Sequence, residues 1–332
     1  MHGMEVAASP FSMGRLGVIH AMSDVMSFKA AGLMLAVCWG MAAGAAEQGV
    51  PSMLPAGGSY RLVWSDEFEG TALDASKWSY RTNFWGKRAT WFATPQDGAV
   101  TVKDGCAHLR IVRRPDGSYC SPQLQTGGLL WDELDPKTGN GVVWPFRPRE
   151  RPKFMHRYGY YECRAKLQRM PGWWTAFWMQ APANGATLDP RRSGVECDIL
   201  ESFDPGRYIV HAFHYNGCGK EYKRFNAQRA PYTPTPEGAF NASYPISTDE
   251  FHVFGLLWEP DGYTVFIDGR QSGHKVGKQG DEVVSETEEF ILVSTELKGF
   301  RQNDRPVPEV AAACEAGDEF TVDYVRVYDF AD

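Results

Sequence analysis

Three carboxylates stand close together in the segment GVECDILESF, at Glu196, Asp198 and Glu201. Successive side chains of a β-strand point to opposite faces, so Glu196 and Asp198 share one face. Cys197 and Ile199 point to the other face, into the core. Strict alternation would turn Glu201 inward as well. A β-bulge, which adds one residue to a strand, would return it to the face of the other two carboxylates.

Paired carboxylates on one open face are typical of glycoside hydrolysis, and a retaining mechanism needs them about 5 Å apart. In that chemistry Glu196 would attack the anomeric carbon and form a glycosyl-enzyme. Glu201 would protonate the leaving oxygen and then activate water, while Asp198 would orient Glu196. Three crowded carboxylates cannot all ionise at their ordinary pKa values, so one proton is shared or retained. A solvated strand face with scattered acids is the alternative explanation.

The rest of the chain predicts the strands that position this segment. Short apolar runs of β character recur from RLVW near residue 61 to FTVDYVRVY at the end, and turn signals such as RPDGS and EPDG separate them. No sustained helical period competes with them. The pattern predicts an all-β sandwich or barrel in one domain.

Charge and length narrow the choice of partners. The chain has 332 residues, of which 43% are hydrophobic, and carries a formal net charge of -7. A basic surface, which nucleic acid or an anionic membrane would need, is not expected from this balance. We expect a monomer that acts on a polysaccharide and uses no catalytic cofactor.

The N-terminal segment predicts export. Lys29 precedes an apolar run that ends in small residues, and Ala43–Ala45 fits a signal-peptidase site. We therefore expect a signal peptide at 1–45, in an over-long form for which Met22 or Met26 is an alternative start. A linker at 46–59 and a single catalytic domain at 60–332 follow. The mature protein is then secreted or periplasmic, without a membrane span.

Export changes the interpretation of the cysteines, because an oxidising compartment permits disulfides. Six cysteines remain after removal of the signal, and their spacing assigns no pairing. Cys163 and Cys197 lie inside strand-like runs, where a small buried apolar side chain explains them equally well.

With its flanks, the carboxylate segment resembles the E-x-D-x-x-E signature of glycoside hydrolase family 16, in the bulge-containing form of its laminarinases, agarases and carrageenases. The opening LVWSDEFEG, the pair YGYYECRAKLQRMPGWWTAFWMQ, the later FHVFGLLWEPDGYTVFIDGR and the closing FTVDYVRVYDF resemble other parts of the family in the same order. The likeness runs from about Arg61 to Asp329. It implies a jelly-roll β-sandwich of two antiparallel sheets with a concave substrate cleft, and an endo-hydrolase of β-glucans or β-galactans.

The resemblance also implies roles for single residues. Glu196, Asp198 and Glu201 take the nucleophile, helper and acid/base positions. The resemblance and the chemistry of sugar stacking further suggest four substrate-binding residues: Trp174, Trp178, His214 and Trp85. A core role for the two strand tryptophans and a structural role for the histidine stay open.

Two further carboxylates, Glu67 and Asp323, resemble positions that hold a structural calcium in many family members. Carboxylate oxygens at strand ends suit that ion.

Two departures from the family pattern leave the substrate open. ILVSTELKGF differs from the ending common in bacterial members active on 1,3-glucans. An insertion between Thr126 and Tyr158 is rich in arginine, which would favour a sulfated galactan or simply form a solvated loop. A transglycosylase and a non-catalytic carbohydrate-binding protein are the alternative functions.

Overall fold

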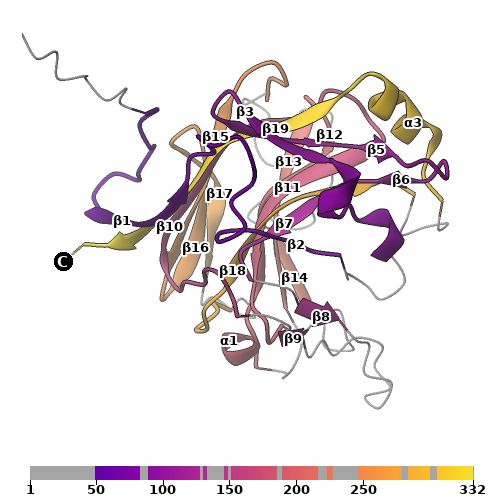
Figure 1. Cartoon of the computed structure of the whole chain (residues 1–332). Helices are drawn as coiled ribbons and strands as arrows, with labels where there is room; N and C mark the ends of the chain where they lie inside the picture. The colour runs from indigo at the N-terminus through magenta and orange to yellow at the C-terminus, as the bar shows by residue number, and fades with distance from the viewer. Residues whose placement is uncertain are drawn as a thin grey trace, which may run out of the picture. The chain divides into compact units, whose positions relative to one another are not determined.

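Two antiparallel β-sheets form the body of Val50–Asp332 (Figure 1). The computed structural model describes residues 49–82, 89–127, 130–132, 146–148, 151–184, 189–215, 223–226, 246–277, 283–299 and 305–331. The predicted signal peptide at 1–45 lies outside these residues. Within them the chain is all-β apart from short helices, which confirms the predicted jelly-roll sandwich.

The first sheet contains, in spatial order, β17 (Arg270–Gly277), β16 (Gly262–Ile267), β15 (His252–Glu259), β10 (Gly159–Lys166), β19 (Glu319–Phe330), β4 (Cys106–Arg110) and β3 (Val100–Lys103), with β1 (Tyr60–Asp66) paired to β19. The second sheet contains β14 (Lys223–Asn226), β13 (Tyr208–Tyr215), β12 (Glu196–Asp204), β11 (Trp173–Gln180), β18 (Phe290–Leu297), β7 (Gln123–Gln125) and β2 (Ser79–Tyr80). The pairs β5 (Val112–Arg113) with β6 (Tyr119–Cys120) and β8 (Leu130–Asp132) with β9 (Phe146–Pro148) stand apart.

Asp-Gly turns join two of the hairpins. Asp268 and Gly269 both have positive φ, at 49° and 72°, and connect β16 directly to β17. Asp104 and Gly105 repeat this between β3 and β4, with φ of 53° and 70°. Two-residue turns with positive φ match the twist of the strands they join, and Asp-Gly tolerates that conformation well. These local signals therefore set the register of both hairpins.

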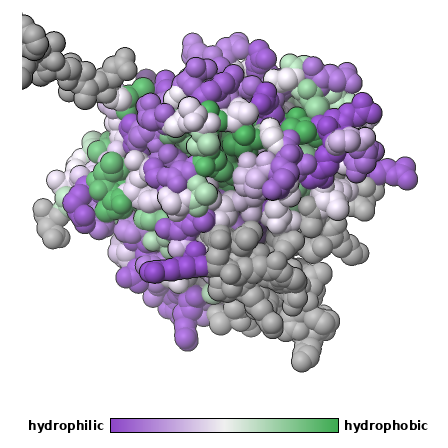
Figure 2. Space-filling model, in the orientation of Figure 1, coloured by the Kyte–Doolittle hydropathy of each residue, from purple (hydrophilic) through white to green (hydrophobic). Residues whose placement is uncertain are grey.

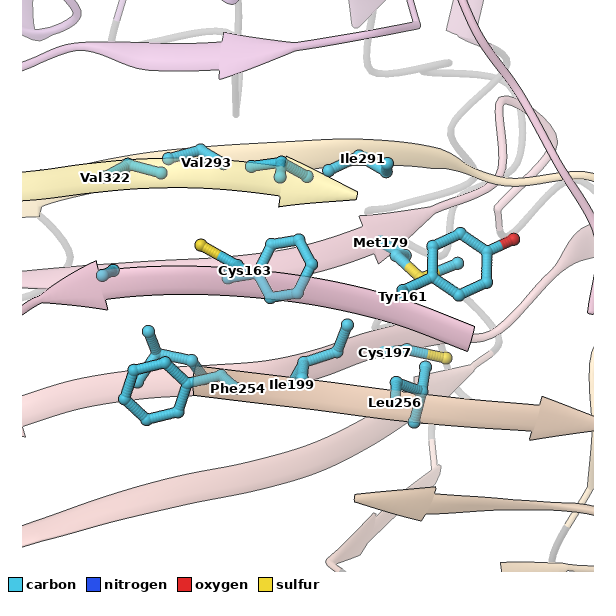
Figure 3. Packing of buried hydrophobic residues seen from close by; sticks show 14 of the residues in the cluster. Tyr161, Cys163, Met179, Cys197, Ile199, Phe254, Leu256, Ile291, Val293 and Val322 are labelled. Atoms are coloured by element: carbon cyan, nitrogen blue, oxygen red, sulfur yellow. The ribbon is translucent and has the colours of Figure 1, made fainter. Parts of the chain in front are cut away.

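The hydrophobic core lies between the sheets. β12 contributes Cys197 and Ile199, and the first sheet contributes Cys163, Phe254 and other apolar residues to the same cluster (Figure 3). Burial of Cys163 and Cys197 agrees with the small apolar role considered for them. All five cysteines in the described part of the chain are free, and Cys218 lies outside it.

The helical elements are short, and the sequence pattern did not predict the longest of them. Within the described residues they are η1 (Ala89–Trp91), η2 (Pro95–Asp97), α1 (Pro190–Ser193) and α3 (Pro308–Glu315). α3 has proline in its first turn and an alanine-rich interior, both of which favour a helix. None of the helices in the described residues is long and apolar enough to cross a membrane.

The predicted linker at 46–59 includes residues that contact the outer face of the first sheet. Met53 donates its backbone N–H to Glu162, and Val50 accepts a hydrogen bond from Arg326. On the face shown in Figure 2, hydrophobic residues lie in small groups among hydrophilic ones.

Candidate active site

A β-bulge in β12 brings the three carboxylates to one face. On β13, Ala212 and Val210 are two residues apart, whereas their partners on β12, Asp198 and Glu201, are three apart. The same shift appears against β11. One extra residue is therefore accommodated between Asp198 and Glu201, as predicted. Because the bulge makes six residues span four strand intervals, the Cα atoms of Glu196 and Glu201 lie roughly 13 Å apart.

We call the side of the second sheet that carries these side chains the carboxylate face. Asp198 and Glu201 stand beside Trp178 and Ala176 of β11 respectively. Glu196 stands beside His214 of β13. The residues between the carboxylates, Cys197, Ile199 and Leu200, belong to the core. Carboxylates on one side and core residues on the other explain why a buried strand carries three acids.

A buried histidine supports the bulge from the core side. His211 Nδ1 lies 2.6 Å from the carbonyl oxygen of Ile199, and its Nε2 lies 2.9 Å from Ser272 Oγ. The ring therefore donates to a carbonyl at the bulge, where the strand ladder is interrupted. Complete burial lowers the pKa of His211 to about 4, so the ring is neutral at neutral pH.

A sharp turn fixes where β12 begins. Gly194 has a φ of 88°, and an added Cβ would stand 2.3 Å from Ala181 Cβ. The next residue, Val195, donates its N–H to Glu289 Oε1 at 3.0 Å. Glu289 is fully buried, and burial raises its pKa to about 8, against the backbone hydrogen bond from Val195. A neutral carboxylic acid therefore anchors the first residues of the carboxylate strand.

Two polar side chains contact two of the three carboxylates. Gln180 at the end of β11 donates its Nε2–H to Glu196 Oε2 at 2.9 Å. His214 Nε2 lies 3.0 Å from Asp198 Oδ2. Asp198 is 5% exposed, so this contact forms in a largely water-free setting where electrostatic interactions are strong.

The two predicted strand tryptophans differ in their surroundings. Trp174 is partly exposed, and its ring centroid lies 5.2 Å from that of Phe203. Trp178 is 6% exposed, packs with Phe92, and donates its indole N–H to Ser294 Oγ at 2.8 Å. Trp174 is therefore the better placed of the two for stacking on a sugar. Trp85 lies outside the described residues.

One group in the described part of the chain has ligand atoms close enough to share a metal ion. Glu196, Asp198 and His214 place such atoms within 4.8 Å of one another. Carboxylate oxygen and imidazole nitrogen are ligands that Zn²⁺ accepts. An ion bound there would occupy the same carboxylate that the predicted mechanism uses as nucleophile.

The predicted calcium residues already have cationic partners. Glu67 accepts two hydrogen bonds from Arg326, at 2.7 and 3.0 Å, and Arg164 donates to Asp323. These contacts fit poorly with calcium, because the ion would have to displace a guanidinium from each carboxylate. Calcium binding at Glu67 and Asp323 stays an untested prediction.

Sequence reasoning missed Gln180, His211 and Glu289. Gln180 is the last residue of β11, two residues after Trp178, and only this even spacing signalled that it shares the carboxylate face. Nothing in the local sequence marks Glu289, which is adjacent to the exposed Glu288.

Comparison with known proteins identifies relatives of this site. Residues 148–287, which include all three carboxylates, match the model of the glycosyl hydrolases of family 16. This match confirms the family resemblance of the sequence.

Two curated relatives cover most of the chain. It is 26% identical over 297 residues to the glucan endo-1,3-β-glucosidase A1 of Niallia circulans, covering 82% of this chain and 38% of that protein. It is 23% identical over 272 residues to the keratan-sulfate endo-1,4-β-galactosidase of Sphingobacterium multivorum, covering 81% and 55%. The chain thus spans less than two thirds of either relative.

A solved structure shares the fold. The catalytic domain of the endo-1,3-β-glucanase (laminarinase) of Thermotoga petrophila RKU-1 matches with a TM-score of 0.55 at 21% identity, covering 83% of this chain and all of that domain.

Proposed function

We propose that this chain, whose sequence and fold resemble those of family 16 glycosyl hydrolases, is a retaining endo-hydrolase of a β-linked polysaccharide. The bulge in β12 is the observation that carries the proposal, because it turns Glu201 to the face of Glu196 and Asp198. A strand without the bulge would bury the acid/base residue in the core.

The contacts around the carboxylates support a double displacement. Glu196, which receives a hydrogen bond from Gln180, attacks the anomeric carbon as a carboxylate. Glu201 gives a proton to the departing sugar oxygen and then takes one from the water that releases the product. Asp198, which contacts His214, orients the nucleophile Glu196 and contributes to the electrostatic potential at that carboxylate.

The proposed substrate is either a β-glucan or a β-galactan, because relatives with each activity match the chain. The glucanase of Niallia circulans covers slightly more of this chain than the galactosidase of Sphingobacterium multivorum. Export with cleavage after Ala45 belongs to the same proposal, since such polymers lie outside the cell. Sequencing the N-terminus of the exported form tests that part and should start near Ala46.

The decisive experiment compares the wild type with Glu196→Gln and Glu201→Gln on laminarin, mixed-linkage glucan, agarose, porphyran and carrageenan. We expect the wild type to release oligosaccharides from one of them, with retained anomeric configuration in early proton NMR spectra. Both variants should lose at least about 10³-fold in turnover while Glu196→Gln keeps its affinity for the polymer. Glu250→Gln removes an exposed carboxylate elsewhere and is the control.

Each alternative gives a different outcome. Binding without turnover by the wild type would identify a carbohydrate-binding protein. Products longer than the starting chains would identify a transglycosylase. Inverted configuration would remove the nucleophile role of Glu196.

A further inference from the structure

A buried arginine lies behind the glutamine that contacts Glu196. Arg81 directly follows β2, and its Nη1 donates to Gln180 Oε1 at 3.1 Å. Gln180 Nε2 in turn donates to Glu196 Oε2 at 2.9 Å. Arg81 is 1% exposed and Gln180 is 4% exposed. An arginine, an amide and a carboxylate therefore form a chain of hydrogen bonds that is largely shielded from water.

The long side chain of Arg81 must reach across the sheet to make this contact. β7 and β18 lie between β2 and β11 in the second sheet. The backbone N–H of Arg81 bonds to Gln123 of β7, which fixes where the side chain starts. Its guanidinium carbon lies 5.5 Å from the centre of the Trp178 ring, a distance at which a cation is attracted to an aromatic face.

The chemistry of the Gln180 amide fixes which of its atoms faces Arg81 and which faces Glu196. A glutamine side chain accepts hydrogen bonds only at its oxygen and donates only from its nitrogen, while a guanidinium only donates. If the amide of Gln180 were reversed, its N–H groups would face the guanidinium and its oxygen would face Glu196. Arg81 therefore holds the amide in the one orientation that donates to Glu196.

We propose that Arg81 is a positioning residue, which acts through Gln180 to keep Glu196 ionised and oriented for nucleophilic attack. This inference rests on the proposed function for its catalytic meaning. A hydrogen bond donated to a carboxylate favours the charged form, and a nearby positive charge favours it further. Low exposure strengthens both effects. Loss of Arg81 lets the amide reverse and turn its oxygen toward the carboxylate.

Arg81→Met removes the guanidinium and Gln180→Met removes the amide, so each variant interrupts the series of hydrogen bonds to Glu196 with little change in side-chain volume. The acidic limb of the pH profile of kcat/KM should move upward by about one unit in both, because Glu196 then protonates more easily. The loss should fall on kcat rather than KM, by about tenfold to hundredfold, as for a hydrogen bond to a charged group. Arg81→Lys should recover part of it.

A matched control and a double variant separate positioning from stability. Arg207→Met removes an exposed arginine that pairs with Asp204 at the other end of β12, and its pH profile should match that of the wild type. The double variant Arg81→Met/Gln180→Met should lose no more than the single variants, since both act through one amide. Additive losses or an unmoved acidic limb would overturn the proposal.

A second measurement is independent of turnover. Carbodiimide coupling to an amine requires a protonated carboxyl group, so the pH at which Glu196 becomes labelled, located by peptide mass spectrometry, reports its pKa. In Arg81→Met and Gln180→Met this pH should rise by about one unit relative to wild type and Arg207→Met. An unchanged labelling pH refutes the role of Arg81 even if the wild type hydrolyses none of the five polymers. A shifted labelling pH in an inactive wild type would refute the proposed function alone.

Discussion

Glu289 should make the protein less stable as the pH rises, and Glu289→Gln should remove that dependence. The side chain is fully buried, and its Oε1 accepts the N–H of Val195. Burial raises the pKa of Glu289 to about 8, helped by the negative charge of Glu196. The folded protein therefore keeps this proton at pH values where the unfolded chain has released it.

The sign and size of the effect follow from this difference. Below the ordinary pKa of about 4.5, both states are protonated and the full stability is present. As the pH rises toward 8, only the unfolded chain gains a free carboxylate, so the free energy of unfolding falls. Each unit of pKa difference corresponds to about 1.36 kcal/mol, which gives a loss of roughly 3–4 kcal/mol between pH 5 and pH 8.

Urea unfolding of the wild type, Glu289→Gln and Glu288→Gln at pH 5 to 9 measures this loss. Glutamine keeps the volume and an oxygen for Val195, so the variant should match the wild type at pH 5 within about 1 kcal/mol and exceed it at pH 8. Glu288 is exposed, so Glu288→Gln controls for loss of a charge at the same turn. Parallel curves for the wild type and Glu289→Gln would show that Glu289 is ionised in the folded protein, and would refute the reasoning.

Three other predictions follow from the site. His211→Phe should lower the free energy of unfolding by about 1–3 kcal/mol at pH 7 and reduce turnover, because the carbonyl at the bulge loses its donor; circular dichroism and kinetics measure both. With its pKa lowered to about 4, His211 contributes stability above pH 6.5 that is lost as the pH falls through 4, so wild type and variant should converge in acid. Trp174→Ala should weaken polysaccharide binding by about 1–3 kcal/mol and leave the protein folded, which titration calorimetry measures. Trp178→Ala should instead lower the free energy of unfolding by about 3–5 kcal/mol, which thermal unfolding measures. EDTA should leave the Tm unchanged, because arginines pair with Glu67 and Asp323; a fall that calcium reverses would show that the ion binds.

Local rules in the sequence were enough to predict much of this protein. Alternation of side chains places Glu196 and Asp198 together and sends Cys197 into the core, and the structure agrees. Turns such as Asp268–Gly269 join neighbouring strands because the required backbone conformation is a property of those two residues. The predicted β-sandwich follows from many such local signals, and α3 was missed because no apolar periodicity marks it.

The position of Glu201 depended on more than its own strand. The family resemblance predicted a bulge, but the bulge is held by pairing with β11 and β13 and by His211, ten residues further along the chain. Alternation alone gave the wrong face for this residue. A one-residue shift in register reverses every side chain of a strand, so the partners on either side must determine it.

Tertiary structure alone brought together the buried polar groups around the carboxylate strand. Arg81 and Gln180 are 99 residues apart, and Glu289 and Val195 are 94 apart, so no local spacing connects them. Burial decides their chemistry, since the same carboxyl group that is ionised at a surface keeps its proton inside a core. A sequence shows which groups can carry charge. Only folding sets how far each one lies from water and from its partners, and these distances determine which carboxyl group is ionised and which keeps its proton.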